Sequence, residues 1–234
     1  MAIYSKKRLA VIPARKGSKR IKNKNYKNFH GQPVFYYTLD YATESQLFAK
    51  IHVSTDCENV AIKTKEYGLE IDFTRPTELA DDHSPLFSVL KFVMSKYREL
   101  GEQFDEAWLL MPCAPLIGVE DLLGAASTFN PNKGPLIAVC ELPIPNSWAY
   151  TRQEDGTIRL VEPNAHSTRS QDLPVSYYDT GSFAIFSAQD AMAETFSGDN
   201  LQAYVLPKKR SVDIDNDDDW EFAEALYEVQ RLKL

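Results

Sequence analysis

Cysteine is scarce in this chain of 234 residues, and the few that are present exclude two kinds of scaffold. Cys57, Cys113 and Cys140 are widely spaced, and no cysteine or histidine pair has the spacing of a zinc site. Three isolated cysteines are also unlike the paired framework of a small disulfide-rich domain. The sequence therefore favours a cytoplasmic protein.

Long apolar runs are missing as well. No stretch approaches the roughly 20 apolar residues that cross a bilayer as a helix. Residues 9–12 follow the basic residues Lys6, Lys7 and Arg8, but they end at Pro13 and are too few for the core of a signal peptide. A membrane partner is therefore not expected.

Acidic residues are absent from the first 39 positions, although the whole chain has a formal net charge of −7. Ten lysines or arginines lie between Lys6 and Lys27. A basic segment on an otherwise acidic protein indicates a local site for an anion rather than a general surface for polyanions. Nucleic acid is therefore not expected as a partner.

Predicted strands and helices alternate through the first 140 residues. Strands are expected at 8–12, 51–54, 69–73, 106–111 and 136–140, and helices at 33–45, 58–67, 85–100 and 119–129. Further strands are expected at 182–186, 203–206 and 211–214, before a last helix at 217–232 that one of its first three aspartates would cap. This alternation predicts an α/β fold, a three-layer sandwich around a mostly parallel twisted sheet, in a single domain over residues 1–234.

The alternation is interrupted at about residues 141–180. A hairpin is predicted at 148–151 and 157–161, around the turn Asp155-Gly156, and a long loop at 162–180. An excursion of this length outside the sheet is typical of a lid or of a contact with a second subunit.

A basic loop follows the first predicted strand directly, at the place where open α/β sheets bind their ligands. Gly17 allows close approach of the backbone, Ser18 can donate a hydrogen bond, and Arg15, Lys19 and Lys24 carry positive charge. The loop has neither the second glycine and Lys-Ser/Thr of a P-loop nor a GxGxxG fingerprint. On composition alone, a triphosphate site, a solvated loop and a nucleic-acid contact all stay open.

Two aspartates near the C-terminus have the spacing of a metal site. Asp213 and Asp215 would point to one face of the predicted strand, and two convergent carboxylates suit Mg²⁺, which keeps waters and takes substrate phosphates as further ligands. Asp56, at the end of another strand, could join them through water. The alternative is a charged turn before the last helix.

Six short motifs follow one another along the chain. They are Ile12-Pro-Ala-Arg-x-Gly-Ser-Lys-Arg-Ile-x-x-Lys-Asn25, Val53-Ser-Thr-Asp56, Arg75-Pro-x-Glu-Leu-Ala80, Leu109-Leu-Met-Pro-Cys-Ala-Pro115, Arg169-Ser-Gln-Asp-Leu173 with Tyr178-Asp-Thr-Gly181, and Asp213-Ile-Asp215. Together they resemble the motifs of the CMP-sialic acid synthetase family, which includes the CMP-pseudaminic, CMP-legionaminic and CMP-Kdo enzymes. The resemblance extends over nearly the whole chain.

This resemblance implies a Rossmann-like fold of the nucleotide-diphospho-sugar transferase type, a need for Mg²⁺, and a homodimer in which the excursion reaches the partner's active site. The implied substrates are CTP and a nine-carbon 2-keto sugar acid, whose anomeric hydroxyl attacks the α-phosphate while pyrophosphate leaves. Arg75 would donate to the cytosine carbonyl, and backbone near Ala80 would read the cytosine amino group. A surface arginine before a structural proline is the alternative interpretation of Arg75.

The residues that the resemblance assigns fall into four groups. The nucleotide would be bound by Ala14, Arg15, Gly17, Ser18, Lys19, Lys24, Asn25, Asp56, Arg75, Ala80 and Ser84. Catalysis would depend on Arg15, Lys19, Lys24, Asp213 and Asp215. The metal would be held by the two aspartates of this set. The sugar would be bound by Met111, Arg169, Gln171, Tyr178, Asp179 and Phe183.

Departures from the family pattern bear on the identity of the sugar. Met111 stands where sialic-acid enzymes usually carry glutamine, Ile117 where they carry arginine, and Tyr178-Asp-Thr-Gly181 where they read Arg-Pro-Asn-Gly. These departures argue against N-acetylneuraminate. Arg169-Ser-Gln-Asp-Leu173 and Tyr178-Asp-Thr-Gly181 are more similar to the pseudaminic acid enzymes, so the resemblance favours pseudaminic acid, with CMP-legionaminate and CMP-N-acetylneuraminate synthetases as alternatives. A remote alternative from another class is an RNA-binding protein that uses the basic loop, whose binding would fall steeply with salt.

Overall fold

The computed structural model describes residues 4–81, 84–164 and 167–232 of the chain. Its main sheet contains β1 (Arg8–Pro13), β4 (Lys50–Ser54), β5 (Glu106–Leu110), β6 (Leu136–Glu141), β9 (Tyr177–Ser187) and β10 (Gln202–Val205). The strands lie in the order β10-β6-β9-β5-β1-β4. The pairs β1–β4, β1–β5 and β10–β6 are parallel, and β9 is antiparallel to both of its neighbours. The expected mostly parallel sheet is therefore confirmed.

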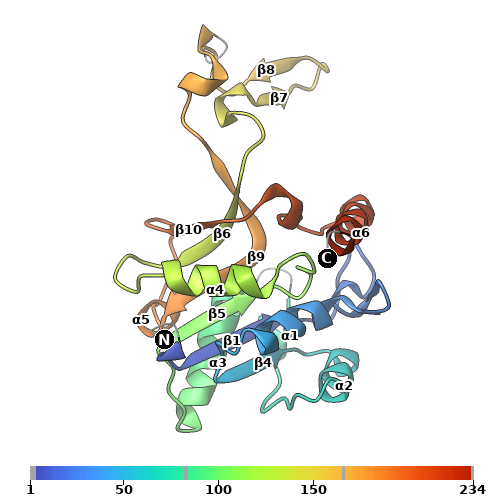
Figure 1. Ribbon diagram of the computed structural model, residues 1–234, viewed down its shortest axis with the longest axis vertical. Helices are drawn as coiled ribbons and strands as arrows, with labels where there is room; N and C mark the ends of the chain where they lie inside the picture. The colour runs from blue at the N-terminus through green and yellow to red at the C-terminus, as the bar shows by residue number, and fades with distance from the viewer. Residues whose placement is uncertain (1–3, 82–83, 165–166, 233–234) are drawn as a thin grey trace.

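Helices cover both faces of this sheet (Figure 1). One face carries α1 (Val34–Glu44), α2 (Glu58–Glu66) and α4 (Val119–Thr128), and the other carries α3 (Leu86–Glu99) and α5 (Ala188–Ala191). The pleat of β1 explains how one strand serves both cores. Ala10 and Ile12 pack toward α1 and α4, whereas Leu9 and Val11 pack toward α3. A strand buried on both faces reads as a continuous apolar run, and every residue of β1 is buried.

A third apolar cluster joins the two ends of the chain. It contains α6 (Asp217–Arg231) and a small hairpin of β2 (Asn28–Phe29) and β3 (Gln32–Pro33), which the sequence patterns did not predict. The Phe29 and Trp220 rings meet edge to face, with their centroids 5.4 Å apart. This packing brings the segment before α6 against the basic loop that follows β1.

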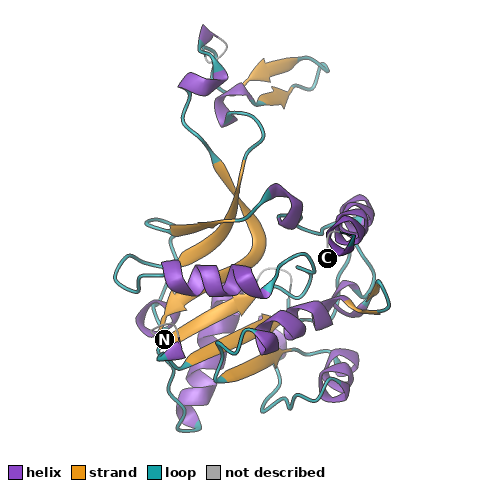
Figure 2. Cartoon of the chain, in the orientation of Figure 1, coloured by secondary structure: helices purple, strands orange, loops and turns teal. Residues whose placement is uncertain are grey.

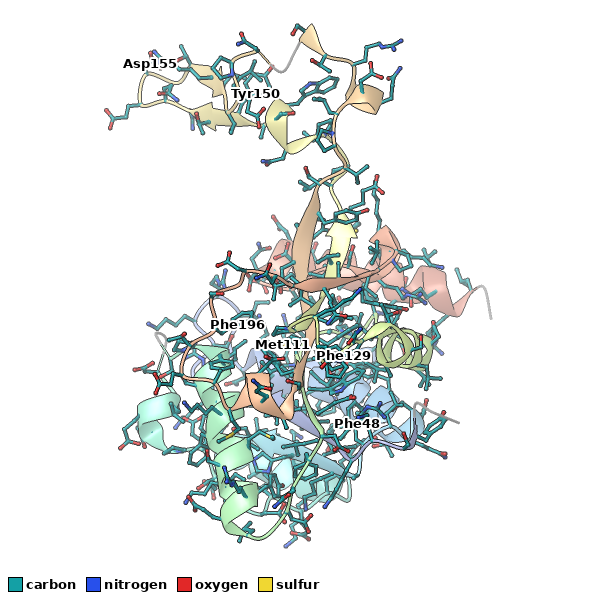
Figure 3. The ribbon with its side chains drawn as sticks, turned by 90° about the vertical axis from the view of Figure 1, so that its left-hand side faces the viewer. Phe48, Met111, Phe129, Tyr150, Asp155 and Phe196 are labelled. Atoms are coloured by element: carbon teal, nitrogen blue, oxygen red, sulfur yellow. The ribbon has the colours of Figure 1, made fainter. Side chains whose placement is uncertain are left out.

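Residues 142–176 form an arm that stands away from the sheet (Figures 2 and 3). The predicted hairpin is confirmed in the arm as β7 (Tyr150–Arg152) and β8 (Ile158–Leu160). Two short 3-10 turns, Asn146–Trp148 and Ser170–Asp172, complete it. The expected loop at 162–180 is wrong at its end, because β9 begins at Tyr177 and pairs with β6 there.

Three further expectations are wrong. Residues 69–73 form no strand, because Phe73 packs on the buried His52 ring, at a centroid distance of 4.4 Å, rather than on the edge of the sheet. Residues 211–214 form no strand either, because the chain turns at Lys208–Arg210 and leaves the sheet edge after β10. The cap of α6 is Asn216, whose side chain accepts from the Asp219 N–H, and not an aspartate.

No helix within residues 4–81, 84–164 and 167–232 is both long and apolar enough to span a membrane.

Candidate nucleotide and metal site

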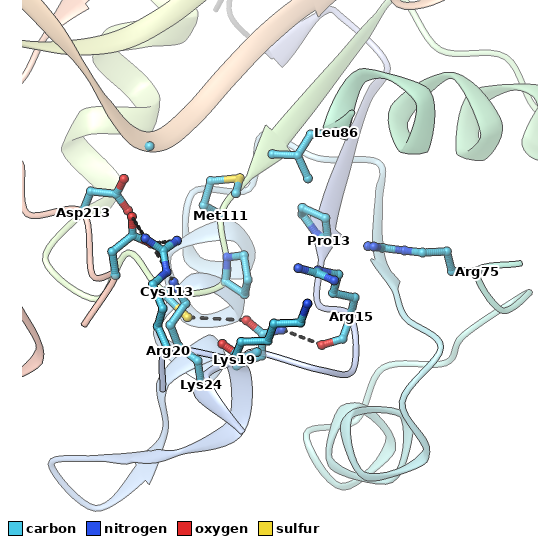
Figure 4. A pocket seen from close by; sticks show the side chains of 15 residues that line it. Pro13, Arg15, Lys19, Arg20, Lys24, Arg75, Leu86, Met111, Cys113 and Asp213 are labelled. Carbon is cyan, nitrogen blue, oxygen red and sulfur yellow. Dashed lines mark hydrogen bonds and ion pairs between the residues drawn. The ribbon is translucent and has the colours of Figure 1, made fainter. Parts of the chain in front are cut away.

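A pocket of about 470 Å³ opens beyond the carboxyl ends of β1 and β5 (Figure 4). Its lining residues are Pro13, Arg15, Ser18, Lys19, Arg20, Lys24, Asn25, Arg75, Leu86, Met111, Pro112, Cys113, Gly181, Asp213 and Asp215. Five of these side chains are cationic and two are carboxylates. The pocket therefore combines a positive wall, which suits a polyanion, with a pair of carboxylates, which suits a cation.

The loop after β1 is fixed through its backbone carbonyls. The Thr55 hydroxyl donates to the Ala14 carbonyl at 2.6 Å, and the Asn25 amide donates to the Arg15 carbonyl at 2.9 Å. Ala14 is itself fully buried. These bonds hold the loop against the end of β4 and leave the Arg15 side chain facing the pocket (Figure 4).

Asp56 also holds this loop. Its carboxylate accepts the Lys16 N–H at 2.7 Å, and Asp56 lies outside the set of residues that line the pocket. Gly17, the next residue, has φ +91°, a conformation that favours glycine, and a Cβ there would meet no atom within 4 Å. The structure thus gives Asp56 a contact with the loop backbone, where the sequence suggested a contact with a metal through water.

Arg75 brings a buried charge to the opposite wall of the pocket. Only 4% of the residue is exposed. Its Nη2 donates to the Ser54 carbonyl at 2.7 Å, and its Nε donates to the Ser54 hydroxyl at 3.2 Å. Burial lowers the pKa of Arg75 to about 10, so the guanidinium keeps its charge at neutral pH. Arg75 is therefore a fixed donor and not a mobile surface arginine.

The segment after Arg75 is tied to the basic loop. The Arg15 Nη1 donates to the Ala80 carbonyl at 3.3 Å. Ser84 lies outside the pocket lining, where its hydroxyl donates to the Glu78 carbonyl at 2.9 Å and its N–H donates to Asp81 at 2.6 Å. The Ala80 carbonyl accepts one hydrogen bond from Arg15 and has a second lone pair that a nucleotide could use.

Asp215 is held by the basic loop. Arg20 donates to both of its carboxylate oxygens, at 2.9 and 2.8 Å, in a bidentate pair. The Lys24 ammonium lies 3.4 Å from the same carboxylate and donates to the Ile214 carbonyl at 2.5 Å. The two ends of the chain thus meet at this carboxylate.

Asp213 lies close to Asp215 and to the backbone of β9. Loss of solvent around its carboxyl raises the pKa of Asp213 above the usual range, the charge of Asp215 raises it further, and Lys24 opposes both effects. A Cβ added at Gly181, whose φ is +58°, would lie 3.0 Å from the Asp213 carboxyl carbon. Gly181 is therefore the residue that leaves room for this carboxylate.

An apolar chamber of about 310 Å³ adjoins the pocket and shares Leu86, Met111 and Gly181 with it. The rest of its wall is Pro85, Phe87, Leu109, Ile137, Asp179, Ser182, Phe183, Ala184, Phe186 and Phe196. Figure 3 shows Phe196 and Met111 in this part of the molecule. Three of the residues predicted to bind the sugar, Met111, Asp179 and Phe183, therefore lie together beside the two carboxylates.

The other three predicted sugar residues are placed elsewhere. Arg169 and Gln171 lie in the arm, where Arg169 pairs with Asp172 at 3.0 Å. The Tyr178 hydroxyl lies 3.2 Å from the Ser211 hydroxyl, on the segment that leads to Asp213. None of the described residues of the arm, 142–164 and 167–176, is among the residues that line the pocket, and Figure 1 shows the arm extending away from the sheet.

Six residues that line the pocket were not among the site residues expected from the sequence, namely Pro13, Arg20, Leu86, Pro112, Cys113 and Gly181. Arg20 and Gly181 stood inside quoted motifs, but only the fold shows that each contacts one of the paired carboxylates. Cys113 lines the pocket with its Sγ 3.5 Å from the Asn25 amide oxygen. Burial raises the pKa of Cys113 to about 12, so its thiol stays protonated and is not a nucleophile.

Comparison with known proteins gives consistent matches. The model of a family described as "Cytidylyltransferase" matches residues 9–228. The chain is 31% identical over 225 residues to the pseudaminic acid cytidylyltransferase of Campylobacter jejuni, a match that covers 95% of this chain and 97% of that protein. It is 29% identical over 231 residues to the CMP-N,N'-diacetyllegionaminic acid synthase of Legionella pneumophila, with 95% and 97% coverage.

Among solved structures, a CMP:2-keto-3-deoxy-manno-octonic acid synthetase in complex with CTP matches with a TM-score of 0.69. The match covers 96% of this chain and 99% of that one, at 18% sequence identity. At this identity the likeness is one of fold.

Proposed function

Because the chain belongs to the cytidylyltransferase family, we propose that it joins the CMP part of CTP to a nine-carbon 2-keto sugar acid, with pseudaminic acid as the favoured substrate. The motif resemblance is confirmed at the level of the family. The fold matches that of a CTP-bound synthetase. The proposal for this chain adds the substrate, the metal, the assembly and the role of each residue.

The observation that carries the proposal is the pairing of five cationic side chains with two carboxylates in one pocket. A nucleoside triphosphate needs cations around its phosphates, and nucleotidyl transfer needs no protein nucleophile. Arg15, Lys19 and Lys24 would hold the β- and γ-phosphates and stabilise the leaving pyrophosphate. Ser18 and the backbone at Gly17 would add hydrogen bonds to the same oxygens.

The cytosine would lie between the basic loop and the segment 75–80. Arg75 has two donors fixed on Ser54, so the rest of its guanidinium is preorganised to face the pocket. A donor at this position suits the cytosine carbonyl. The Ala80 carbonyl, which accepts from Arg15, is an acceptor of the kind that would select the cytosine amino group.

The donor set of Asp213 and Asp215 fits Mg²⁺. No cluster of three metal-binding side chains occurs among residues 4–81, 84–164 and 167–232, so these residues offer no complete cage for a metal. Two carboxylates with substrate phosphates and waters are the kind of set that Mg²⁺ accepts. Burial raises the pKa of Asp213 most, and the charge of Asp215 raises it further; a cation between the two carboxylates would offset their repulsion. Bound there, Mg²⁺ would neutralise charge on the α-phosphate and lower the pKa of the attacking hydroxyl.

In the proposed reaction, a bond forms from the anomeric oxygen to the α-phosphorus, and the bond from that phosphorus to the bridging oxygen of pyrophosphate breaks. The hydroxyl proton leaves to solvent. The chain holds the two reactants in line, because the chamber lies next to the carboxylates and the cationic wall lies on the nucleotide side.

The apolar chamber supports an acylated, deoxygenated sugar over a more hydroxylated one. Pseudaminic acid carries two acylamino groups and a terminal methyl group, whereas N-acetylneuraminate ends in hydroxyls. Phe183, Met111 and Ile137 would cover such apolar groups, and would leave hydroxyls without hydrogen-bond partners. A difference of this kind is worth roughly 10- to 200-fold in kcat/KM.

The arm supports a homodimer. Ile144, Tyr150, Ile158 and Val175 are exposed apolar side chains on it, and such patches mark protein contacts. Because the arm stands away from its own pocket, Arg169 and Gln171 can reach a sugar site only on a second copy. Sedimentation at micromolar concentration should give the mass of a dimer, and Ile158→Asp should shift it toward the monomer. We also expect the protein to work in the cytoplasm, where CTP is available.

The test is release of pyrophosphate from CTP and Mg²⁺ with pseudaminic, legionaminic or N-acetylneuraminic acid, and with Kdo as a control. We expect the highest kcat/KM with pseudaminic acid and a value at least about tenfold lower with N-acetylneuraminic acid. Equal rates with both would remove the role given to the chamber. Release with none of the four sugars, from folded protein, would refute the proposed function.

A further inference from the structure

The segment that carries both carboxylates contains no strand or α-helix, and one short 3-10 turn at Lys208–Arg210 is its only regular element. Residues 206–216 leave the sheet after β10, turn at Lys208–Arg210 and run to the start of α6. A pair of metal ligands needs a fixed separation, because ligand distances around Mg²⁺ vary little. Contacts from elsewhere in the fold must therefore supply this rigidity.

We propose that Arg210 is a positioning residue, which through a partly buried ion pair with Asp121 holds this segment so that Asp213 and Asp215 face one cation. The inference rests on the proposed function in one respect, namely that the two carboxylates hold a divalent cation. Arg210 is not among the residues that line the pocket, so its effect passes through the segment that it fixes.

The ion pair has the properties of a structural clamp. The Arg210 Nη2 lies 3.1 Å from the Asp121 Oδ1, and the two side chains are 19% and 0% exposed. The other Asp121 oxygen accepts the Gly118 N–H at 3.0 Å, at the start of α4. The Arg210 Nη1 also pairs with Glu120, in the first turn of the same helix. Burial raises the pKa of Asp121, and the Gly118 N–H and the charge of Arg210 oppose this effect. Among the described residues, Asp121 Oδ1 and Arg210 Nε have no hydrogen-bond partner, so the pair is a charge contact at 3.1 Å and not an aligned hydrogen bond. This contact links the segment to α4, because a buried charge is destabilised when its partner is removed.

Two further contacts hold the residues on either side of Arg210. The Gln230 side chain, on α6, donates to the Lys209 carbonyl at 3.1 Å. The Tyr178 hydroxyl, on β9, lies 3.2 Å from the Ser211 hydroxyl. Three consecutive residues are thus fixed by three different elements, and Asp213 follows two residues later. Tyr178 also stands where the arm leaves the sheet, so the base of the arm and the carboxylate segment are joined.

The experiment measures metal binding without turnover. Protein is titrated into a fixed Mn²⁺–CTP mixture with no sugar acid, and binding is read from the relaxation of water protons. CTP binding in EDTA is measured in parallel by calorimetry, as a test of the basic wall alone. The variants are Arg210→Gln, Arg210→Lys, Tyr178→Phe and, as the reference for loss of the metal, Asp215→Asn.

We expect Arg210→Gln to weaken Mn²⁺–CTP binding about tenfold, as loss of a group that orients a metal ligand does. CTP binding in EDTA should change by less than about twofold, because the cationic wall is untouched. Arg210→Lys should recover part of the loss, since an ammonium can still pair with Asp121. Tyr178→Phe removes one hydroxyl and no charge, so it should fold and show a smaller loss in the same direction.

Arg8→Gln is the matched control for the loss of a buried ion pair. Arg8 pairs with Glu106 at 2.6 Å, with both side chains almost fully buried, at the amino ends of β1 and β5. This variant should lower the melting temperature yet keep the Mn²⁺–CTP affinity. If Arg8→Gln weakened that affinity as much as Arg210→Gln, the effect would be general destabilisation and the proposal would fall.

The remaining outcomes separate the proposal from the function on which it rests. Wild-type affinity in Arg210→Gln, with binding lost in Asp215→Asn, would overturn the role of Arg210 and leave the metal site intact. Unchanged affinity in Asp215→Asn would overturn both, because the carboxylates would not hold the cation. No outcome depends on which sugar acid is the substrate.

Discussion

Replacing Gly181 with alanine should displace the Asp213 carboxylate while the rest of the sheet stays in place. Gly181 has φ +58°, and the added Cβ would lie 3.0 Å from Cγ and from Oδ2 of Asp213. The added Cβ would therefore push the Asp213 carboxylate by a few tenths of an ångström, away from the position that the proposed metal site needs. Ligand distances at a metal site tolerate about 0.2 Å.

Gly181→Ala should have two effects, a loss of stability and a displacement of the Asp213 carboxylate. A left-handed conformation costs an alanine about 1–2 kcal/mol, and for a chain of this size each kcal/mol lowers the melting temperature by about 2–4 °C. The matched control is Gly68→Ala, because Gly68 has φ +97° and a Cβ there would meet no atom within 4 Å. Both variants should therefore melt a few degrees lower, but only Gly181→Ala should disturb the carboxylate pair.

The assay is pyrophosphate release at saturating CTP across a range of Mg²⁺ concentrations. Gly181→Ala should need more Mg²⁺ for half-maximal rate and lose about tenfold in kcat relative to Gly68→Ala. Equal rates and equal Mg²⁺ requirements for the two variants would show that Asp213 has room to move without consequence. The reasoning about its fixed position would then be refuted.

Three other outcomes are expected. Asp215→Asn should reduce kcat by at least about a hundredfold with an unchanged circular dichroism spectrum, and lost secondary structure would show that Asp215 holds the fold instead. Arg75→Ala should raise the KM for CTP by about tenfold or more and the KM for the sugar by much less, whereas equal effects would argue against a role at the base. Burial lowers the pKa of His52 to about 4. Because its neutral form is the one that folding favours, this group should reduce the free energy of unfolding by up to about 3 kcal/mol as pH falls from 6.5 to 4. Urea unfolding should lose this pH-dependent component in His52→Leu.

Local signals predicted most of the fold. The apolar run before Pro13 predicted a strand, and the helical spacing in residues 85–100 predicted a helix. Both predictions are confirmed, because the order of apolar residues within each element decides which of its side chains are buried. The expectation at 69–73 was wrong because an apolar pattern does not show what the side chains pack against. Phe73 covers His52, and the backbone of that segment pairs with no strand. The antiparallel start of β9 was missed because Tyr177 and Tyr178 pair with β6 across the arm, which no local pattern encodes.

The basic wall of the pocket was predictable because most of its residues are close together in the sequence. Arg15, Ser18, Lys19 and Lys24 follow one strand, so the end of that strand places them together. The residues that the resemblance assigns to the sugar are far apart in the sequence, and no local pattern predicted which of them lie together. Met111 and Phe183 meet across neighbouring strands, whereas Arg169 lies in the arm. Residues assigned to one site by resemblance can thus stand in two places in a single chain.

The paired carboxylates of Asp213 and Asp215 show most clearly what a sequence pattern cannot predict. Their spacing of two residues suggested a strand that would point both to one face, and that strand does not exist. The pair is held instead by partners far away in sequence, since Arg210 lies against α4, 90 residues from Glu120, and Lys24 reaches Ile214 across 190 residues. Such contacts form only when the whole fold is closed.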